Sequence, residues 1–119
     1  MAQPNLINTS SCFLKFASFE NVSTSFTTLL SSATNKQRKI VSLYACNTGS
    51  ATTTFDLYFT ATGTTRYICN DVPIPAKTTL VVITRDAPIH FEEGSHSLGM
   101  QASGTGIDVY CSYEEYDDA

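Results

Sequence analysis

The fold class is decided by residues 40–60, IVSLYACNTGSATTTFDLYFT. Apolar and polar residues alternate on both sides of Asn47, Gly49 and Ser50, and many of them are β-branched or aromatic, which is the pattern of β-strands. Asn, Gly and Ser are residues typical of turns. The stretch therefore predicts a β-hairpin with arms 39–47 and 53–60. No helical periodicity of comparable strength occurs elsewhere, so we expect an all-β protein.

The composition agrees with that expectation. Hydrophobic residues make up 42% of the 119 residues, a normal globular fraction, whereas charged residues make up only 15%. The missing polarity is supplied by 17 Thr and 13 Ser, and the branched side chain of Thr suits an exposed strand face. The length and composition predict one domain spanning residues 1–119, with residues 1–10 forming an extended N-terminal arm.

Turn signals recur every 8–12 residues and predict about eight short strands. Asn70–Lys77 contains two prolines and is expected to be an extended connection, whereas Thr79–Arg85 is the most continuously apolar segment and is expected to lie centrally in a sheet. Besides the hairpin, the expected strands are Cys12–Phe16, Val22–Leu30, Arg66–Cys69, Thr79–Arg85, Ile89–Phe91, His96–Ala102 and Ile107–Tyr113. These features predict a single antiparallel β-sandwich, either immunoglobulin-like or jelly-roll.

The alternation also assigns faces. The expected core residues are Leu43, Phe55, Leu57, Leu80, Val82 and Val109. Tyr44 and Tyr58 fall on the opposite face of the hairpin, where Tyr67 and Tyr110 can join them. Two interpretations remain open: an exposed tyrosine patch that contacts a protein or a glycan, or the inner face of the second sheet.

The charges indicate no special partner. A net charge of −4 argues against nucleic acid, which requires clustered Lys and Arg. Residues 31–37 are expected to be a loop, and the basic run 36–39 is expected to be solvated where the chain leads into the Ile40 strand. The acidic run 114–118 is expected to extend into solvent. No apolar stretch approaches the length of a membrane span, and residues 1–6 do not resemble a signal peptide. We therefore expect folding in the cytoplasm.

The cysteines are expected to remain reduced. Cys12, Cys46, Cys69 and Cys111 contain no closely spaced pair of the kind found in zinc or redox motifs. Cys111 is in phase with Ile107 and Val109, on the core face. Cys46 is out of phase with its apolar neighbours, so these two sulfurs should point to opposite faces.

Two groups of residues are candidates for a metal-binding or a catalytic site, and neither forms a specific motif. His90, Glu92 and His96 could surround a metal ion, but the pattern is unspecific, and an exposed hairpin with polar residues on its solvent face is the favoured interpretation. Ser95, His90 and Asp86 could be combined into a triad, although no nucleophile-elbow motif accompanies them. Adjacent carboxylates such as Glu92-Glu93 point to opposite faces of a strand. We therefore predict no catalytic, cofactor-binding or metal-binding residues, and a protein that is not an enzyme.

The order of strands and turns resembles the small all-β structural proteins of tailed bacteriophage virions. The resemblance covers about residues 38–116 and rests on a series of features in sequence order. They are the strand 40–47, the Thr48-Gly49-Ser50-Ala51 turn, Phe55-Asp56-Leu57-Tyr58, Tyr67-Ile68, Val72-Pro73-Ile74-Pro75-Ala76, the Leu80 strand, Glu93-Gly94, and the closing Ile107-Asp108-Val109-Tyr110-Cys111-Ser112-Tyr113-Glu114-Glu115. Gly94-Ser95-His96 departs from the pattern, which often has Gly-Asp at this point.

The resemblance implies a non-enzymatic subunit of the virion, most simply a capsid decoration or cement protein that binds the major capsid protein and forms a homo-oligomer. It equally admits a neck, tail, baseplate or fibre component, and a carbohydrate-binding module is a third hypothesis. Residues 1–16 would be the partner-binding arm, and the turns 47–52 and 61–65 would form the exposed end. Neither nucleic acid nor a membrane is an expected partner.

Overall fold

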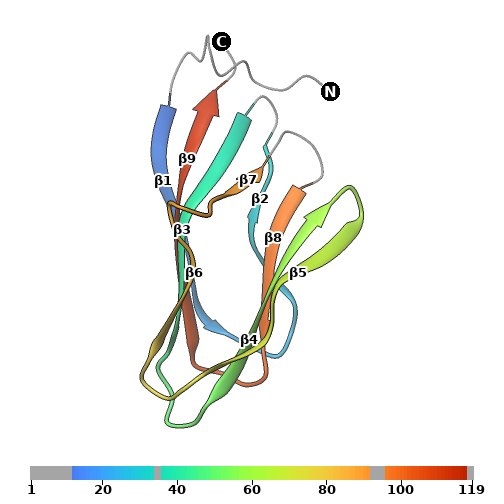
Figure 1. The fold of residues 1–119 in the computed structure, drawn as a ribbon. Helices are drawn as coiled ribbons and strands as arrows, with labels where there is room; N and C mark the ends of the chain where they lie inside the picture. The colour runs from blue at the N-terminus through green and yellow to red at the C-terminus, as the bar shows by residue number, and fades with distance from the viewer. Residues whose placement is uncertain (1–11, 34–35, 92–95, 118–119) are drawn as a thin grey trace.

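In the computed structural model, residues 12–33, 36–91 and 96–117 are described, and they form nine strands in two antiparallel sheets packed face to face (Figure 1). The first sheet, sheet A, has the order β1-β9-β3-β6, with β7 also paired to β3; the second, sheet B, has the order β2-β8-β4-β5. The strands are β1 (Cys12–Val22), β2 (Thr27–Ser31), β3 (Lys36–Asn47), β4 (Thr53–Ala61), β5 (Thr64–Ile74), β6 (Thr79–Ile83), β7 (Ile89–Phe91), β8 (His96–Ala102) and β9 (Ile107–Asp117). The predicted β-sandwich is confirmed.

The strand order settles the topology that the sequence left open. The chain passes from one sheet to the other after β1, β2, β3, β5, β7 and β8. Among the described strands, consecutive ones share a sheet only at β4–β5 in sheet B and at β6–β7 in sheet A. Two four-stranded sheets whose strands alternate in this manner, with a short extra strand β7, make up a jelly roll. An immunoglobulin sandwich instead begins with two neighbouring strands in one sheet.

The predicted hairpin of residues 39–47 and 53–60 is wrong. Both segments are strands, but β3 pairs with β6, β7 and β9, whereas β4 pairs with β5 and β8. Residues 48–52 therefore cross from sheet A to sheet B. Local alternation and turn residues are the same for a hairpin and for such a crossing, so the pattern could not distinguish them.

Asn47 holds this crossing in place. Its side chain is completely buried; Nδ2 donates to the carbonyls of Ala51 and Ile74, each at 2.8 Å, and Oδ1 accepts from the Gly49 amide at 2.9 Å. One amide thus closes the loop on itself and ties it to the end of β5. The residue that marked a turn in the sequence fixes the connection between the sheets.

Replacing Asn47 by alanine is expected to lower the free energy of unfolding by about 2 kcal/mol, because the buried Ile74 carbonyl loses its donor. Urea unfolding followed by circular dichroism measures the change. Ser50→Ala, at an exposed position of the same loop, is the control and should change stability by less than about 0.5 kcal/mol. Equal stabilities for the two variants would contradict the role given to Asn47.

Several of the predicted segments differ from the observed strands in their bounds or in their position within a sheet. The residues expected as one strand, Val22–Leu30, contain the end of β1, a turn and most of β2. The proline-rich connection is partly strand: β5 continues to Ile74 and accommodates Pro73, because β5 is an edge strand. Thr79–Arg85 is not central, since β6 lies at the edge of sheet A and Val81 is 54% exposed.

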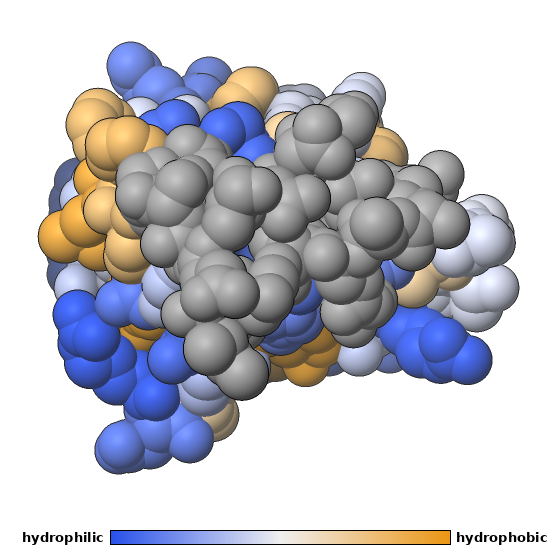
Figure 2. All heavy atoms as spheres, turned by 90° about the horizontal axis from the view of Figure 1, so that it is seen from above, coloured by the Kyte–Doolittle hydropathy of each residue, from blue (hydrophilic) through white to orange (hydrophobic). Residues whose placement is uncertain are grey.

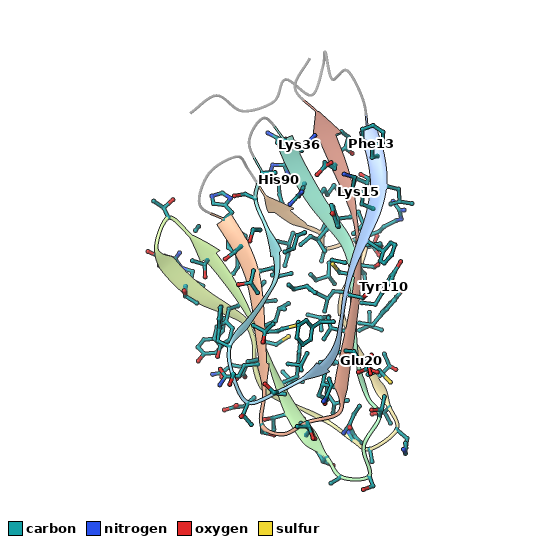
Figure 3. The ribbon with its side chains drawn as sticks, turned by 180° about the vertical axis from the view of Figure 1, so that it is seen from behind. Phe13, Lys15, Glu20, Lys36, His90 and Tyr110 are labelled. Atoms are coloured by element: carbon teal, nitrogen blue, oxygen red, sulfur yellow. The ribbon has the colours of Figure 1, made fainter. Side chains whose placement is uncertain are left out.

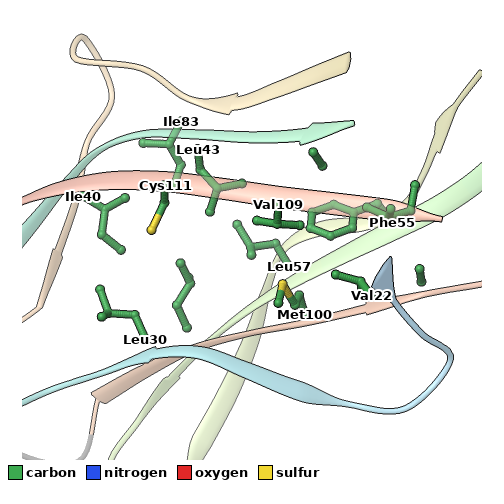
Figure 4. Close-up of a cluster of buried hydrophobic side chains, with 14 of the residues drawn as sticks. Val22, Leu30, Ile40, Leu43, Phe55, Leu57, Ile83, Met100, Val109 and Cys111 are labelled. Atoms are coloured by element: carbon green, nitrogen blue, oxygen red, sulfur yellow. The ribbon is translucent and has the colours of Figure 1, made fainter. Parts of the chain in front are cut away.

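The core lies between the sheets (Figure 4). Leu43, Phe55, Leu57 and Val109 are fully buried, as predicted. Leu80 and Val82 are only partly buried, and Ile83 instead reaches the core, because the register between β3 and β6 shifts between Leu43 and Tyr44. The buried cluster comprises Val22, Leu30, Ile40, Leu43, Ala45, Phe55, Leu57, Ile74, Ile83, Leu98, Met100, Ala102, Ile107, Val109, Cys111 and Tyr113.

The ends of the sandwich differ from expectation. The 61–65 turn is a hairpin turn, as predicted, but it lies at the opposite end of β4 from the 47–52 loop, so the two do not form one exposed end (Figure 1). The predicted arm, residues 1–10, lies outside the described residues, and residues 12–16 are paired with β9 in β1. No helix in the described parts of the chain is long and apolar enough to cross a membrane.

Candidate functional site: the aromatic face of sheet A

A row of aromatic side chains crosses the outer face of sheet A. Tyr110 of β9 is opposite Tyr44 of β3, and Tyr44 is opposite Val81 of β6. Phe16 of β1 lies diagonally across from Tyr110, whose direct partner is Ser18. The ring centroids of Phe16 and Tyr110 are 5.8 Å apart, those of Tyr110 and Tyr44 are 6.0 Å apart, and both pairs are nearly parallel. We call Phe16, Tyr110 and Tyr44 the aromatic row.

The aromatic row is exposed. Phe16 is 65% exposed, and Tyr110 and Tyr44 are 42% and 41% exposed. Val81 and Leu14 extend the apolar surface at its two ends. Figure 2 shows hydrophobic residues gathered along one side of the molecule, the side formed by sheet A in Figure 1, and Figure 3 shows Tyr110 on that side. Exposed aromatic and aliphatic side chains that lie side by side on one sheet face make this face a candidate interaction surface.

A shallow hollow of about 390 Å³ adjoins the row at Tyr44. It lies over β3 and β6, and one cation, Arg85, lies on its rim. Arg85 Nη1 is 3.8 Å from Glu114 Oε2, and the Arg85 side chain is 71% exposed. The lining residues are Val41, Ser42, Tyr44, Val81, Ile83, Thr84, Arg85 and Ser112.

Sheet B carries a separate aromatic cluster. Tyr58 lies between Phe26 and Tyr67, with ring centroids at 5.3 and 4.7 Å, and its hydroxyl donates to Gln101 Oε1 at 2.8 Å. Burial, together with a hydrogen bond to Tyr67, raises the pKa of Tyr58 to about 12. Phe26 covers Gly99, where a Cβ would lie only 2.4 Å from the Phe26 ring, so glycine is required for this packing.

The tyrosines predicted as one group are therefore divided between two surfaces. Tyr44 and Tyr110 lie on the outer face of sheet A, and Tyr58 and Tyr67 lie on the outer face of sheet B. None of the four belongs to the buried core cluster. The prediction that they oppose the core positions is confirmed; the single patch is wrong, because β3 and β4 belong to different sheets.

A charged cluster lies at the end of the sandwich where β1 begins. Glu115 of β9 is completely buried. Lys15 Nζ is 2.7 Å from its Oε2, Arg38 Nε is 2.8 Å from its Oε1, and Lys36 Nζ is 3.8 Å from its Oε2. Arg38 also donates to the Ser31 carbonyl. Figure 3 shows Lys15 and Lys36 at the same end of the molecule.

This cluster corrects two predictions. Glu115 does not extend into solvent, and Lys36 and Arg38 are part of β3, not of a solvated loop. Burial alone would raise the pKa of Glu115, but the hydrogen bonds and charges of Lys15 and Arg38 outweigh it and hold this pKa below its ordinary value. The sequence does indicate that Glu115 is buried. The alternation that places Ile107, Val109, Cys111 and Tyr113 on the core face of the strand also places position 115 there.

The residues weighed for chemistry are not assembled into one site. His90 is on β7 in sheet A and is exposed, whereas His96 is on β8 in sheet B and packs its ring against Phe59 at 5.6 Å. Glu92, Glu93 and Ser95 lie outside the described residues. Among residues 12–33, 36–91 and 96–117, no three His, Cys, Asp or Glu side chains are grouped in a manner that could hold a metal ion.

The cysteines occupy the faces that the alternation predicts. Cys111 is buried in the core, and burial raises the pKa of its thiol to about 11. Cys46 is partly exposed on the other face of sheet A, and Cys12 is exposed on β1. All four sulfurs are free thiols.

The chain matches no family model and no curated protein. Among solved structures it is similar to a chain of the Bacillus endospore appendages, a family of disulfide-linked pili, with a TM-score of 0.45 and 12% identity over 100% of this chain and 93% of that chain. It is also similar to a chain of the T13 viral particle of IBDV, with a TM-score of 0.45 and 10% identity over 93% of this chain and 36% of that chain. Both similarities are too remote to bear on function.

Proposed function

We propose that this protein is a non-enzymatic structural subunit that binds other subunits through the aromatic face of sheet A. The observation that carries the proposal is the aromatic row of Phe16, Tyr110 and Tyr44, which is exposed across three neighbouring strands. Tyrosine and phenylalanine provide large contact areas at low conformational cost, and tyrosine adds a polar tip that tolerates water before binding. A rigid sheet presents them already ordered.

The geometry of the row favours a protein partner over a glycan. Tyr110 stacks on Phe16 on one side and on Tyr44 on the other, so its ring faces are already engaged. At the centre of the row, Tyr110 therefore offers a partner mainly its ring edge and its hydroxyl group. A sugar ring that stacks on an aromatic residue needs an open ring face, whereas a protein surface can pack against such edges.

The particle that we propose is the virion of a tailed bacteriophage, with a role as capsid decoration or cement protein on the major capsid protein. Support comes from the resemblance of residues 38–116 to small all-β virion proteins and from the β-sandwich to which those residues contribute most of the strands. The protein would fold in the host cytoplasm and join the virion afterwards. A neck, tail, baseplate or fibre position is the alternative within the same class.

The copy number in purified phage particles tests the position. Quantitative mass spectrometry measures the amount of this chain relative to the major capsid protein. Comparable amounts are expected for a decoration protein, and a few copies per particle would move the protein to the neck, tail or fibre. Absence from the particles would refute the virion proposal.

The double variant Tyr44→Ser/Tyr110→Ser tests the face. We expect it to fold as the wild type does, because both side chains are exposed, but to be lost from particles assembled in its presence. Tyr67→Ser, on sheet B, is the matched control and should be incorporated normally. Circular dichroism checks folding. Normal incorporation of the double variant would exclude the aromatic row as the binding face.

A further inference from the structure

The sandwich has four sheet edges, and they are not equivalent. β1 and β6 are the outer strands of sheet A, and β2 and β5 are the outer strands of sheet B. An edge strand presents unpaired backbone groups that can pair with another chain. Natural proteins therefore block such edges with short strands, prolines, bulges or charges.

Three of the edges carry such blocks. β2 has five residues and an irregular register between Thr28 and Leu30. β5 contains Pro73 and two register shifts. The edge formed by β6 and β7 along β3 is interrupted by residues 84–88, a turn that contains a proline.

The edge of β1 is open by comparison. β1 has eleven residues, and its register with β9 is regular from Cys12 to Phe19. Among the described residues, β1 forms a ladder with β9 only. Phe13, Leu14 and Phe16 are 47%, 70% and 65% exposed. Lys15 does not block the edge as a free charge would, because Glu115 already binds its ammonium group.

We propose that two copies of this protein pair through β1, antiparallel and about a two-fold axis at Phe16, so that their A sheets become one continuous sheet. The partner of this edge is thus a second copy of the same chain. Antiparallel pairing of identical edge strands is self-complementary, which is the condition for a closed dimer. The inference rests on the edge of β1, and it is independent of the function proposed above.

Charge and apolar contact select the register. With Phe16 at the axis, Lys15 faces Ala17 of the second copy, and Leu14 faces Ser18. An axis at Lys15 would place the two lysines, each already bound to Glu115 of its own copy, opposite one another with no added attraction between the copies. An axis at Ala17 would place Leu14 opposite Glu20, an unfavourable pair. The Phe16 register also brings the two aromatic rows end to end across the axis, which continues the row from one copy into the other.

Cysteine cross-linking of the full-length protein tests this register. In a Cys12→Ser background, Phe16→Cys places two thiols on directly opposed residues, whose Cα atoms are about 4.5–5.5 Å apart in an antiparallel pair, within the range for a disulfide. Ser18→Cys lies on the same face of β1, but its two copies would be four residues apart, about 13 Å. Mild oxidation should yield a covalent dimer for Phe16→Cys and none for Ser18→Cys or for the background protein.

Sedimentation supplies a second measurement that needs no cross-link. The wild-type protein is expected to be a dimer, Phe16→Lys a folded monomer, and the control Tyr67→Lys still a dimer. A monomeric wild type, cross-linking of Ser18→Cys as fast as that of Phe16→Cys, or a dimer that survives Phe16→Lys would each overturn the proposal. If Phe16→Lys fails to fold, as judged by circular dichroism, the cysteine pair still decides.

Discussion

Phe55→Ala is expected to lower the free energy of unfolding by about 3–5 kcal/mol, the largest effect that the structure predicts for a single substitution. The ring is completely buried between the two sheets, and it is the largest of the fully buried side chains. Its partner on β8 is Ala102, which is too small to fill the space that the ring would leave. The cavity would therefore persist, and its walls would lose their contacts.

Chemical denaturation of Phe55→Ala measures this loss. Phe26→Ala is the matched control, because Phe26 is 52% exposed and its loss should cost only about 1 kcal/mol. The slope of the unfolding free energy against denaturant should stay unchanged, so that the midpoint reports stability. Similar losses for the two variants would place Phe55 outside the core.

Glu115→Gln is expected to cost about 3 kcal/mol at neutral pH. The substitution removes a negative charge that Lys15, Lys36 and Arg38 share. The value lies at the low end of the range for breaking a buried ion pair, because the lysine side chains are 45% and 34% exposed and can turn to water. A loss of this size is much larger than the loss expected for a solvent-exposed residue of the acidic segment 114–118.

The loss of stability in Glu115→Gln is expected to depend on pH. The pKa of Glu115 is lower in the folded protein than in the unfolded chain. The ionised carboxylate therefore stabilises the fold fully above its unfolded pKa of about 4.3, and this stabilisation is lost as the pH falls through the folded pKa. The stability difference between wild type and Glu115→Gln should therefore shrink as the pH falls from 7 toward 3. Glu20→Gln, at an exposed position of β1, is the control; a pH-independent difference for Glu115→Gln would contradict the ion cluster.

The sequence predicted the fold class because strand alternation is a local property. The phases of Leu43, Phe55, Leu57 and Val109 were read correctly, and they place these residues in the core. What could not be read locally was which strands pair. Residues 40–60 look like a hairpin, yet their two strands lie in opposite sheets, because pairing depends on partners more than 20 residues away.

The candidate site was predictable only in part, for the same reason. The alternation placed Tyr44 on the face away from the core, but the row exists only because β9 and β1 bring Tyr110 and Phe16 beside it. The sequence assigns Phe16 to a first strand and to the predicted arm 1–16, but the alternation does not reveal that it lies beside Tyr110. The acidic composition of segment 114–118 predicts exposure, whereas the alternation along β9 places Glu115 on the buried face, and here the alternation prevails.

The place of β9 in sheet A has a consequence for biosynthesis. β9 lies between β1 and β3 and pairs with both, so residues 107–117 connect strands made much earlier. A nascent chain that ends before position 107 holds β1 and β3 without the strand that joins them. Sheet A therefore closes only after nearly all of these residues have left the ribosome, and the long-range pairing makes that step slow. Chains cut short before β9 would lack the joined strands that carry the aromatic row, so premature termination would also remove the face through which we propose that the protein binds.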